Sequence, residues 1–231
     1  MLTAVSIRNA HDAAVQWNWR GFQGSLDAIR YAKRELTNVD KALSYVRPED
    51  RGLVVQAGGC LGIFPKYLAQ FFGRVLTFEP DPQNFINLRL NVLERNVTAF
   101  PVALGATAGP VLLSRDRRDG KTNTHDGIVH VAAHLDGPGA VQMIRLDSVE
   151  LPRLDLLYLD TEGCELEALQ GSVNTITVFR PVIAVEVNKN LQHVGLTEAD
   201  VMRWFQTQCY TYVAQAGSDR IFVPMERGVC H

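Results

Sequence analysis

The sequence has 231 residues, of which 46% are apolar, and its 23 basic and 25 acidic side chains give a formal net charge of −2. A chain of this composition can bury one large core, and its charge argues against a protein that binds the nucleic-acid backbone. It has no apolar run of the ~18 residues that span a membrane, no secretory leader and no CxxC pair, so we expect a cytoplasmic protein without a membrane segment, disulfide framework or cysteine zinc site.

The first fifty residues have the spacing of an amphipathic helix. Apolar side chains recur every three or four positions from Leu26 to Val46, and Pro48 ends the pattern. Thr37 and Asp40 have the spacing of a capping box, so two short helices fit this stretch as well as one long helix. We expect residues 1–50 to form a helical cap over a domain that spans residues 51–231.

From residue 51 onward, short apolar strands alternate with helices. Strands are predicted at 53–55, 74–79, 98–104, 154–160, 181–187, 209–213 and 220–223. Helices are predicted to begin near Ile63, at Pro82 behind the N-cap Asp81, at Glu165, and behind the capping pair Thr197 and Asp200. Near-continuous apolar strands joined by helices are typical of a parallel sheet covered on both faces. The predicted fold is therefore α/β and Rossmann-like: a doubly wound, mostly parallel seven-stranded sheet with an antiparallel edge strand.

Residues 114–139 are the least patterned part of the domain. They fit a solvated surface loop as well as a loop that contacts the substrate. Within them, His130 and His134 have the spacing that would place both side chains on one face of a helix. The valines and alanines around them do not distinguish helix from strand, so we predict no metal site.

A glycine-rich turn and an acidic residue mark a ligand site where the first two predicted strands end. The turn Gly58-Gly59-Cys60-Leu61-Gly62 lies between a strand and a helix, where glycines let a ligand approach the backbone closely. Glu79 closes the next strand and could accept both hydroxyls of a ribose. The turn is neither GxGxxG nor a P-loop, which argues against nicotinamide dinucleotides and nucleoside triphosphates. An adenosyl ligand without a pyrophosphate, S-adenosylmethionine, fits this combination.

An ordered series of short phrases extends this pattern. The phrases are Val54-Val55-Gln56-Ala57-Gly58-Gly59-Cys60-Leu61-Gly62, Phe78-Glu79-Pro80, Pro101-Val102-Ala103-Leu104, Arg145-Leu146-Asp147 and Tyr158-Leu159-Asp160-Thr161-Glu162-Gly163-Cys164-Glu165. Over about residues 50–190 the sequence therefore resembles the FkbM-type family of class I S-adenosylmethionine-dependent methyltransferases. Two positions depart from the family pattern: Gln56 replaces an acidic residue that would pair with the ammonium of the cofactor, and Cys60 replaces an asparagine.

The resemblance implies a role for each matching residue. Around the cofactor, it implies contacts from Gln56, Gly58, Gly59, Cys60, Gly62, Glu79, Pro80, Asp81, Ala103 and Asp160, with Asn84 as a weaker candidate. The glycines would form the wall against the methionine part of the cofactor, Glu79 would bind the ribose and Ala103 would border the adenine. Asp160 and Glu162, with Glu186 behind them, are the candidates for a general base. Glu165, on the following helix, is interpreted as structural.

The predicted activity is methyl transfer to a hydroxyl group of a small molecule or sugar. The phrase after the fourth strand, Asp160-Thr161-Glu162-Gly163, is not the Asn/Asp-Pro-Pro-Tyr phrase of enzymes that methylate the amino groups of nucleic acids. One alternative is a module of the same fold that binds the cofactor but has lost turnover through the changes at Gln56 and Cys60. Another is a nicotinamide-dependent oxidoreductase, which would need a pyrophosphate turn that the sequence lacks.

Overall fold

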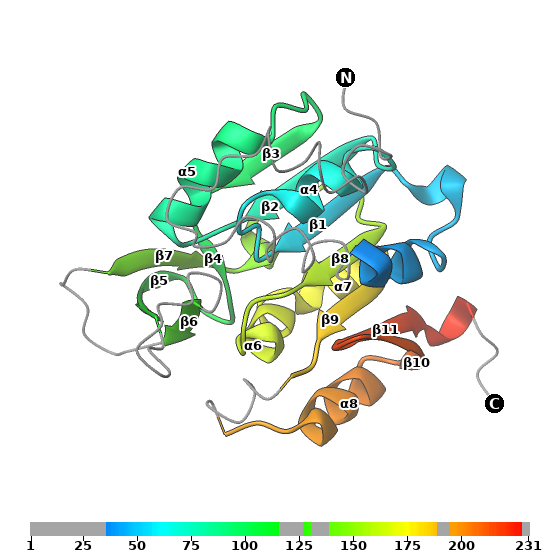
Figure 1. Cartoon of the computed structure of the whole chain (residues 1–231). Helices are drawn as coiled ribbons and strands as arrows, with labels where there is room; N and C mark the ends of the chain where they lie inside the picture. The colour runs from blue at the N-terminus through cyan, green and yellow to red at the C-terminus, as the bar shows by residue number, and fades with distance from the viewer. Residues whose placement is uncertain (1–35, 116–126, 131–138, 189–194, 228–231) are drawn as a thin grey trace.

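The computed structural model describes residues 36–115, 127–130, 139–188 and 195–227, and its centre is a seven-stranded sheet (Figure 1). The strand order is β10-β11-β9-β8-β1-β2-β3. Five strands run parallel: β1 (Leu53–Ala57), β2 (Arg74–Phe78), β3 (Val97–Phe100), β8 (Leu156–Leu159) and β9 (Val182–Glu186). The hairpin β10 (Tyr210–Ala216) and β11 (Asp219–Pro224) completes the sheet. The predicted doubly wound, mostly parallel fold is confirmed.

The antiparallel strand was predicted at the edge of the sheet, but this strand, β11, is the second strand from the edge. β11 pairs antiparallel with both β9 and β10, so β10 is outermost. Ile221 and Phe222 of β11 are buried in the hydrophobic clusters on opposite faces of the sheet, as an interior strand requires. Thr211 and Tyr212 of β10 are exposed, which suits the edge. The hairpin therefore folds back so that its more apolar strand is the inner one.

Helices cover both faces of the sheet (Figure 1). They are α4 (Ile63–Leu68), α5 (Pro82–Asn91), α6 (Glu165–Gln170), α7 (Val173–Phe179) and α8 (Glu198–Thr207). Asp81 caps α5 by accepting hydrogen bonds from the backbone N–H groups of Gln83 and Asn84, and Thr197 and Asp200 form a capping box on α8. Both predicted caps are confirmed. No helix in the described part of the chain is long and apolar enough to cross a bilayer.

The described end of the predicted helical cap packs on the sheet. Residues 36–43 are helical, and the apolar side chains of this segment share one buried cluster with α4 and the sheet residues Val54 and Tyr158. Thr37 lies inside this helix and does not begin it, while Asp40 accepts a hydrogen bond from the Tyr67 hydroxyl at 2.5 Å. The rest of the predicted cap, residues 1–35, lies outside the described residues, so the boundary at residue 50 stays a prediction.

A second, four-stranded sheet lies beside the first and was not predicted. Its strands, in the order β4-β7-β5-β6, are β4 (Ala103–Leu104), β7 (Ala140–Ile144), β5 (Gly109–Arg115) and β6 (Gly127–His130). The single strand predicted at 98–104 is divided between the two sheets near Pro101, which has no N–H to continue a ladder. His130 belongs to a strand, so the helical spacing considered for His130 and His134 does not apply, and His134 lies outside the described residues.

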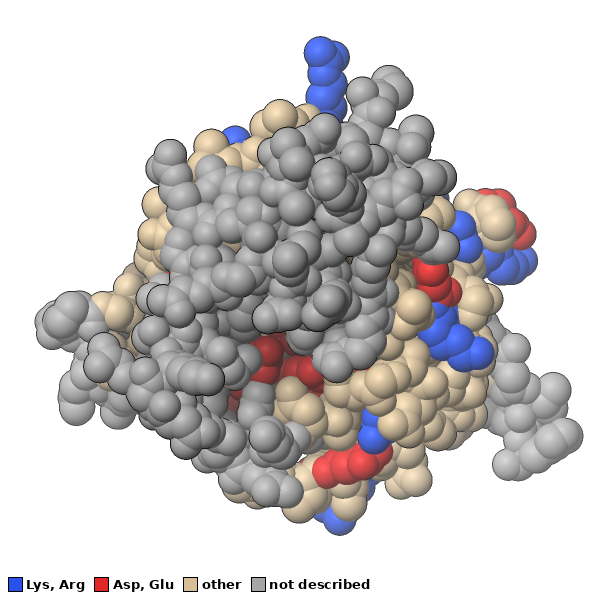
Figure 2. Space-filling view, in the orientation of Figure 1, with Lys and Arg blue, Asp and Glu red and all other residues tan. Residues whose placement is uncertain are grey.

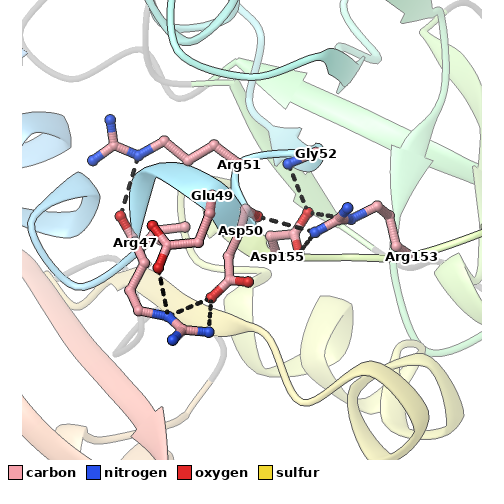
Figure 3. Close-up of polar contacts among 8 residues, drawn as sticks. Arg47, Glu49, Asp50, Arg51, Gly52, Arg153 and Asp155 are labelled. Carbon is pink, nitrogen blue, oxygen red and sulfur yellow. Dashed lines mark hydrogen bonds and ion pairs between the residues drawn. The ribbon is translucent and has the colours of Figure 1, made fainter.

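Polar side chains gather where β1 and β8 begin, at the amino ends of the parallel strands (Figure 3). The Asp155 carboxylate accepts hydrogen bonds from the backbone N–H groups of Gly52 and Leu53, at 3.0 and 2.7 Å. It also forms an ion pair with Arg153. Arg51 donates to the carbonyl of Leu43, the last residue of the helical segment 36–43, and to the carbonyl of Val46 just beyond it. This Asp155 cluster therefore joins the start of β1 to the start of β8 and to the end of the helical segment 36–43.

Replacing Asp155 with alanine should lower the free energy of unfolding by about 2 kcal/mol, because two backbone N–H groups lose their acceptor. Urea denaturation measures this change. The control is Arg153→Gln, which should cost much less because Arg153 is about half exposed and surface ion pairs contribute little. Equal losses for the two variants would contradict the role given to the backbone acceptor.

Candidate active site

A cleft opens at the carboxyl ends of β1, β2 and β8, opposite the Asp155 cluster. It encloses about 1020 Å³ of space, part of which is open to solvent. The predicted site residues that line it are Gly58, Gly59, Cys60, Glu79, Pro80, Asp81, Asn84, Ala103, Asp160 and Glu162. Three predicted residues, Gln56, Gly62 and Glu186, are not in its lining. The structure thus brings most of the predicted residues to one place, the edge where parallel α/β sheets bind ligands.

The turn after β1 approaches its neighbours too closely for side chains. Gly58 has a φ of +84°, and a Cβ added to it would lie 1.7 Å from the backbone oxygen of Asp160. A Cβ on Gly59 would lie 2.5 Å from Leu88 Cδ1. The N–H groups of both glycines donate to the carbonyl of Phe78, each at 3.0 Å. The turn is therefore fixed between β2 and the loop after β8, with bare backbone facing the cleft.

Gly62, which was predicted to contact the cofactor, lies outside the lining of the cleft and packs close to Val92. It precedes α4 with a φ of +91°, and an added Cβ would lie 2.4 Å from Val92 Cγ2. A glycine is needed here for the left-handed turn and for the close approach of the segment after α5. The prediction that Gly62 lines the cofactor site is therefore not supported by its position.

Glu79 is a buried carboxylate in the lining of the cleft. Its Oε2 accepts from the N–H of Cys60 at 2.6 Å, and its Oε1 accepts from the N–H of Asp81 at 2.8 Å. Burial raises its pKa to about 7, although these two bonds and the Asn84 side chain oppose that shift. The carboxylate thus links the glycine turn to the start of α5 while it lines the cleft.

Three carboxylates meet at the other side of the cleft. Oxygens of Asp160, Glu162 and Glu186 lie within 4.8 Å of one another. The pKa of Asp160 is raised well above its usual value, first by burial and then by the negative charges of Glu186 and Glu162. Asp160 and Glu162 line the cleft, and Glu186 stands behind them with hydrogen bonds from Asn188 and Ser218. Carboxylates this close are arranged to hold a proton or a cation between them.

Glu165 supports the loop that presents these acids. Its side chain is buried and accepts hydrogen bonds from the backbone N–H groups of Thr161 and Gly163, and burial raises its pKa to about 7. Glu162, between them, has a φ of +56°, a left-handed conformation that is costly for a residue with a side chain. The structural interpretation of Glu165 agrees with this geometry, because its two acceptor oxygens stabilise the strained loop.

Cys60 combines an unusual backbone with an inert thiol. Its φ of +44° lies in the left-handed region that asparagine tolerates better than most residues. Burial and the nearby Glu79 charge raise the pKa of its thiol well above the usual value, so the thiolate is disfavoured. Its contribution to the site is the backbone N–H that holds Glu79.

Gln56, which was predicted to contact the cofactor, lies outside the lining of the cleft. Its side chain is fully buried and makes hydrogen bonds to Thr77 and to the carbonyls of Ala57 and Gly58. It points into the interior because its cross-strand partner on β2, Thr77, offers a hydroxyl there.

Sequence reasoning missed the apolar part of the lining. It includes Leu61, Ile63, Phe64, Phe78, Leu104, Leu113 and Cys164. The position of Phe78 at a strand end was a usable signal, since such ends border the ligand in this fold. Leu113 gave no signal, because it belongs to the second sheet.

Comparisons with known proteins match this chain to methyltransferases. The family described as "Methyltransferase FkbM domain" matches residues 67–214. The hexuronic acid methyltransferase AglP of Haloferax volcanii is 24% identical over 209 residues, which is 90% of this chain and 79% of the relative. The solved methyltransferase FkbM of Methylobacillus flagellatus KT has a TM-score of 0.51 and 15% identity, and the match covers 95% of this chain. This chain spans 59% of the length of that solved protein, and the likeness concerns the fold alone.

Proposed function

The chain belongs to the FkbM methyltransferase family, and we propose that it methylates a hydroxyl group of a small molecule or sugar. The methyl donor is S-adenosylmethionine, which supplies an activated methyl group on its sulfonium when bound. The observation that supports the proposal best is the cleft itself, in which the bare glycine turn after β1 lies between Glu79, which follows β2, and Asp160 and Glu162, which follow β8. One side is suited to a nucleoside and the other to proton transfer.

The described residues fit the donor. Gly58 and Gly59 lack side chains, pack closely against their neighbours and line the cleft, so their backbone atoms can contact a ligand directly. The buried Glu79 carboxylate can accept a hydrogen bond from a ribose hydroxyl. Phe78 and Ala103 give the same part of the cleft an apolar border for a flat base.

Asp160 and Glu162 are proposed to take the proton of the acceptor hydroxyl. A general base works best when its pKa lies near the working pH, and burial and neighbouring charges move the pKa of Asp160 upward from its usual value. The buried Glu165 holds the loop in place, so both carboxylates reach the cleft from a fixed backbone. Enclosure of the site contributes further by keeping water from competing with the acceptor.

A sugar or other small hydroxylated molecule is proposed as the acceptor. The relative AglP is named for a hexuronic acid, which is a sugar derivative. The formal net charge is −2, and the basic side chains that Figure 2 shows are scattered over this face, several of them beside acidic ones. Neither feature favours a nucleic-acid backbone as the partner.

The proposal is tested by calorimetric titration with S-adenosylmethionine and S-adenosylhomocysteine, followed by transfer assays on a panel of sugars and other hydroxyl acceptors. We expect binding of both ligands and methylation of at least one acceptor at oxygen. Absence of binding at millimolar concentration would overturn the proposal. Binding without transfer to any acceptor would favour the catalytically degenerate module that the changes at Gln56 and Cys60 suggest.

The affinity for S-adenosylhomocysteine should rise about tenfold between about pH 6 and 8, because Glu79, with a pKa of about 7, accepts hydrogen bonds best when ionised. Fold stability should change in the opposite direction. Glu79 has a higher pKa folded than unfolded, so its contribution is fully present below the unfolded value of 4.5 and is lost as the pH rises through about 7. Titrations and urea denaturation across this range measure both effects. In Glu79→Gln the affinity profile should flatten, whereas the stability profile should become only shallower, because Glu165 also has a pKa of about 7 and still contributes. An unchanged affinity profile in that variant would assign the effect to another group.

A further inference from the structure

We infer that Gln56 is a positioning residue of this enzyme, one that fixes the glycine turn against which the methionine half of the cofactor binds. The inference rests on the proposed function. It gives a role to the residue at which this chain departs from the acidic pattern of the family, and that role involves no contact with the cofactor.

The hydrogen bonds of the Gln56 side chain leave its amide only one orientation. Its Nε2 donates to the carbonyl oxygens of Ala57 and Gly58, at 3.0 and 2.9 Å. Backbone carbonyls can only accept, so the NH₂ group must face them and the amide oxygen must face Thr77. The Thr77 hydroxyl donates to that oxygen at 2.5 Å. Both side chains are fully buried, so water does not substitute for any of these partners.

These bonds complete the restraint on the turn. The N–H of Gly58 donates to Phe78, its carbonyl accepts from Gln56, and its Cα lies against the backbone oxygen of Asp160. The carbonyl of Ala57 accepts from Gln56 and also from the N–H of Asp160, at 3.1 Å. One buried amide therefore sets the position of the turn relative to the loop that carries Asp160.

An acidic side chain could not replace the amide in this conformation. A carboxylate has no proton to donate, and at this position it would place a negative oxygen about 3 Å from two carbonyl oxygens. At position 56 this chain therefore has a hydrogen-bond donor to the turn in place of the acidic residue of the family. Gln56 orders the backbone wall of the cleft instead of presenting a charge to the cofactor.

The test compares two ligands that differ in the methionine half. S-adenosylhomocysteine carries this half, whereas 5′-methylthioadenosine has the same nucleoside and thioether without it. Calorimetric affinities are measured for the parent, for Gln56→Glu, and for the milder Thr77→Val, which removes the hydroxyl that orients the amide and keeps the shape of the side chain. Thr77→Ser, which retains the hydroxyl, is the matched control.

We expect Gln56→Glu and Thr77→Val to lose at least about tenfold in affinity for S-adenosylhomocysteine, roughly the effect of one lost buried hydrogen bond. Their affinity for 5′-methylthioadenosine should stay within about twofold of the parent, and Thr77→Ser should resemble the parent with both ligands. If Gln56→Glu does not fold, Thr77→Val carries the test. Equal losses for the two ligands, or no loss, would overturn the role of Gln56. A parent that binds neither ligand would instead overturn the proposed function.

Discussion

Replacing Glu79 with alanine should weaken the binding of S-adenosylhomocysteine by on the order of 100-fold, a loss of about 3 kcal/mol. The variant removes a charged acceptor for the ribose, and it also removes the acceptor of the Cys60 and Asp81 N–H groups that border the cleft. The expected loss is therefore the sum of a missing contact and a less ordered turn. Calorimetric titration of the purified variant measures it.

A matched variant separates these two contributions. Glu79→Gln keeps the size of the side chain and one acceptor oxygen, so it can still hold one of the two N–H groups. We expect it to bind better than Glu79→Ala and worse than the parent. Asp155→Asn, at the opposite edge of the sheet, serves as a control for general destabilisation and should bind normally. Normal binding by Glu79→Ala would show that the ribose assignment is wrong.

Replacing Asp160 with asparagine should lower kcat by about 10²- to 10⁴-fold, the range in which general bases contribute. Asparagine has the shape of aspartate but cannot take the proton of the acceptor hydroxyl at neutral pH. The fold should be at least as stable as before, because the variant removes one of three mutually repelling carboxylates. Steady-state kinetics with thermal unfolding as a companion measurement will check both expectations.

The kinetic constants distinguish a base from a cofactor ligand. If Asp160 takes the proton, the affinity for S-adenosylhomocysteine stays within about threefold of the parent while kcat falls. If Asp160 instead pairs with the cofactor ammonium, the affinity falls as strongly as kcat, and the role of base passes to Glu162. Glu186→Gln is the control, because Glu186 stands behind the cleft and should affect turnover less than Asp160 does.

The elements that form from local pattern could be predicted from the sequence. The parallel strands are mostly apolar in sequence, and the cap residues Asp81 and Thr197 occupy the positions that helix starts favour. The second sheet could not be predicted, because its segments lack the continuous apolar runs that identified the strands of the main sheet.

The same distinction applies to the site. Glu79 and Asp160 were identified because they close strands of the main sheet, and that edge follows from the fold alone. The orientation of Gln56 depends on its register with Thr77, which only the assembled sheet defines. The position of Gly62 beside Val92, outside the lining of the cleft, likewise depends on how α5 packs. The residues at strand ends can thus be predicted from one sequence, whereas a side-chain orientation that depends on the pairing of two strands cannot.

The inner position of β11 has a consequence for how the protein forms during synthesis. β9 is buried on both faces, yet its hydrogen-bonding edge is covered only when β11 pairs with it. Until the ribosome has released residues up to about 224, the nascent chain presents an uncovered apolar strand of the kind that other chains can pair with. A premature stop before the final hairpin would therefore yield an aggregating product rather than a smaller enzyme.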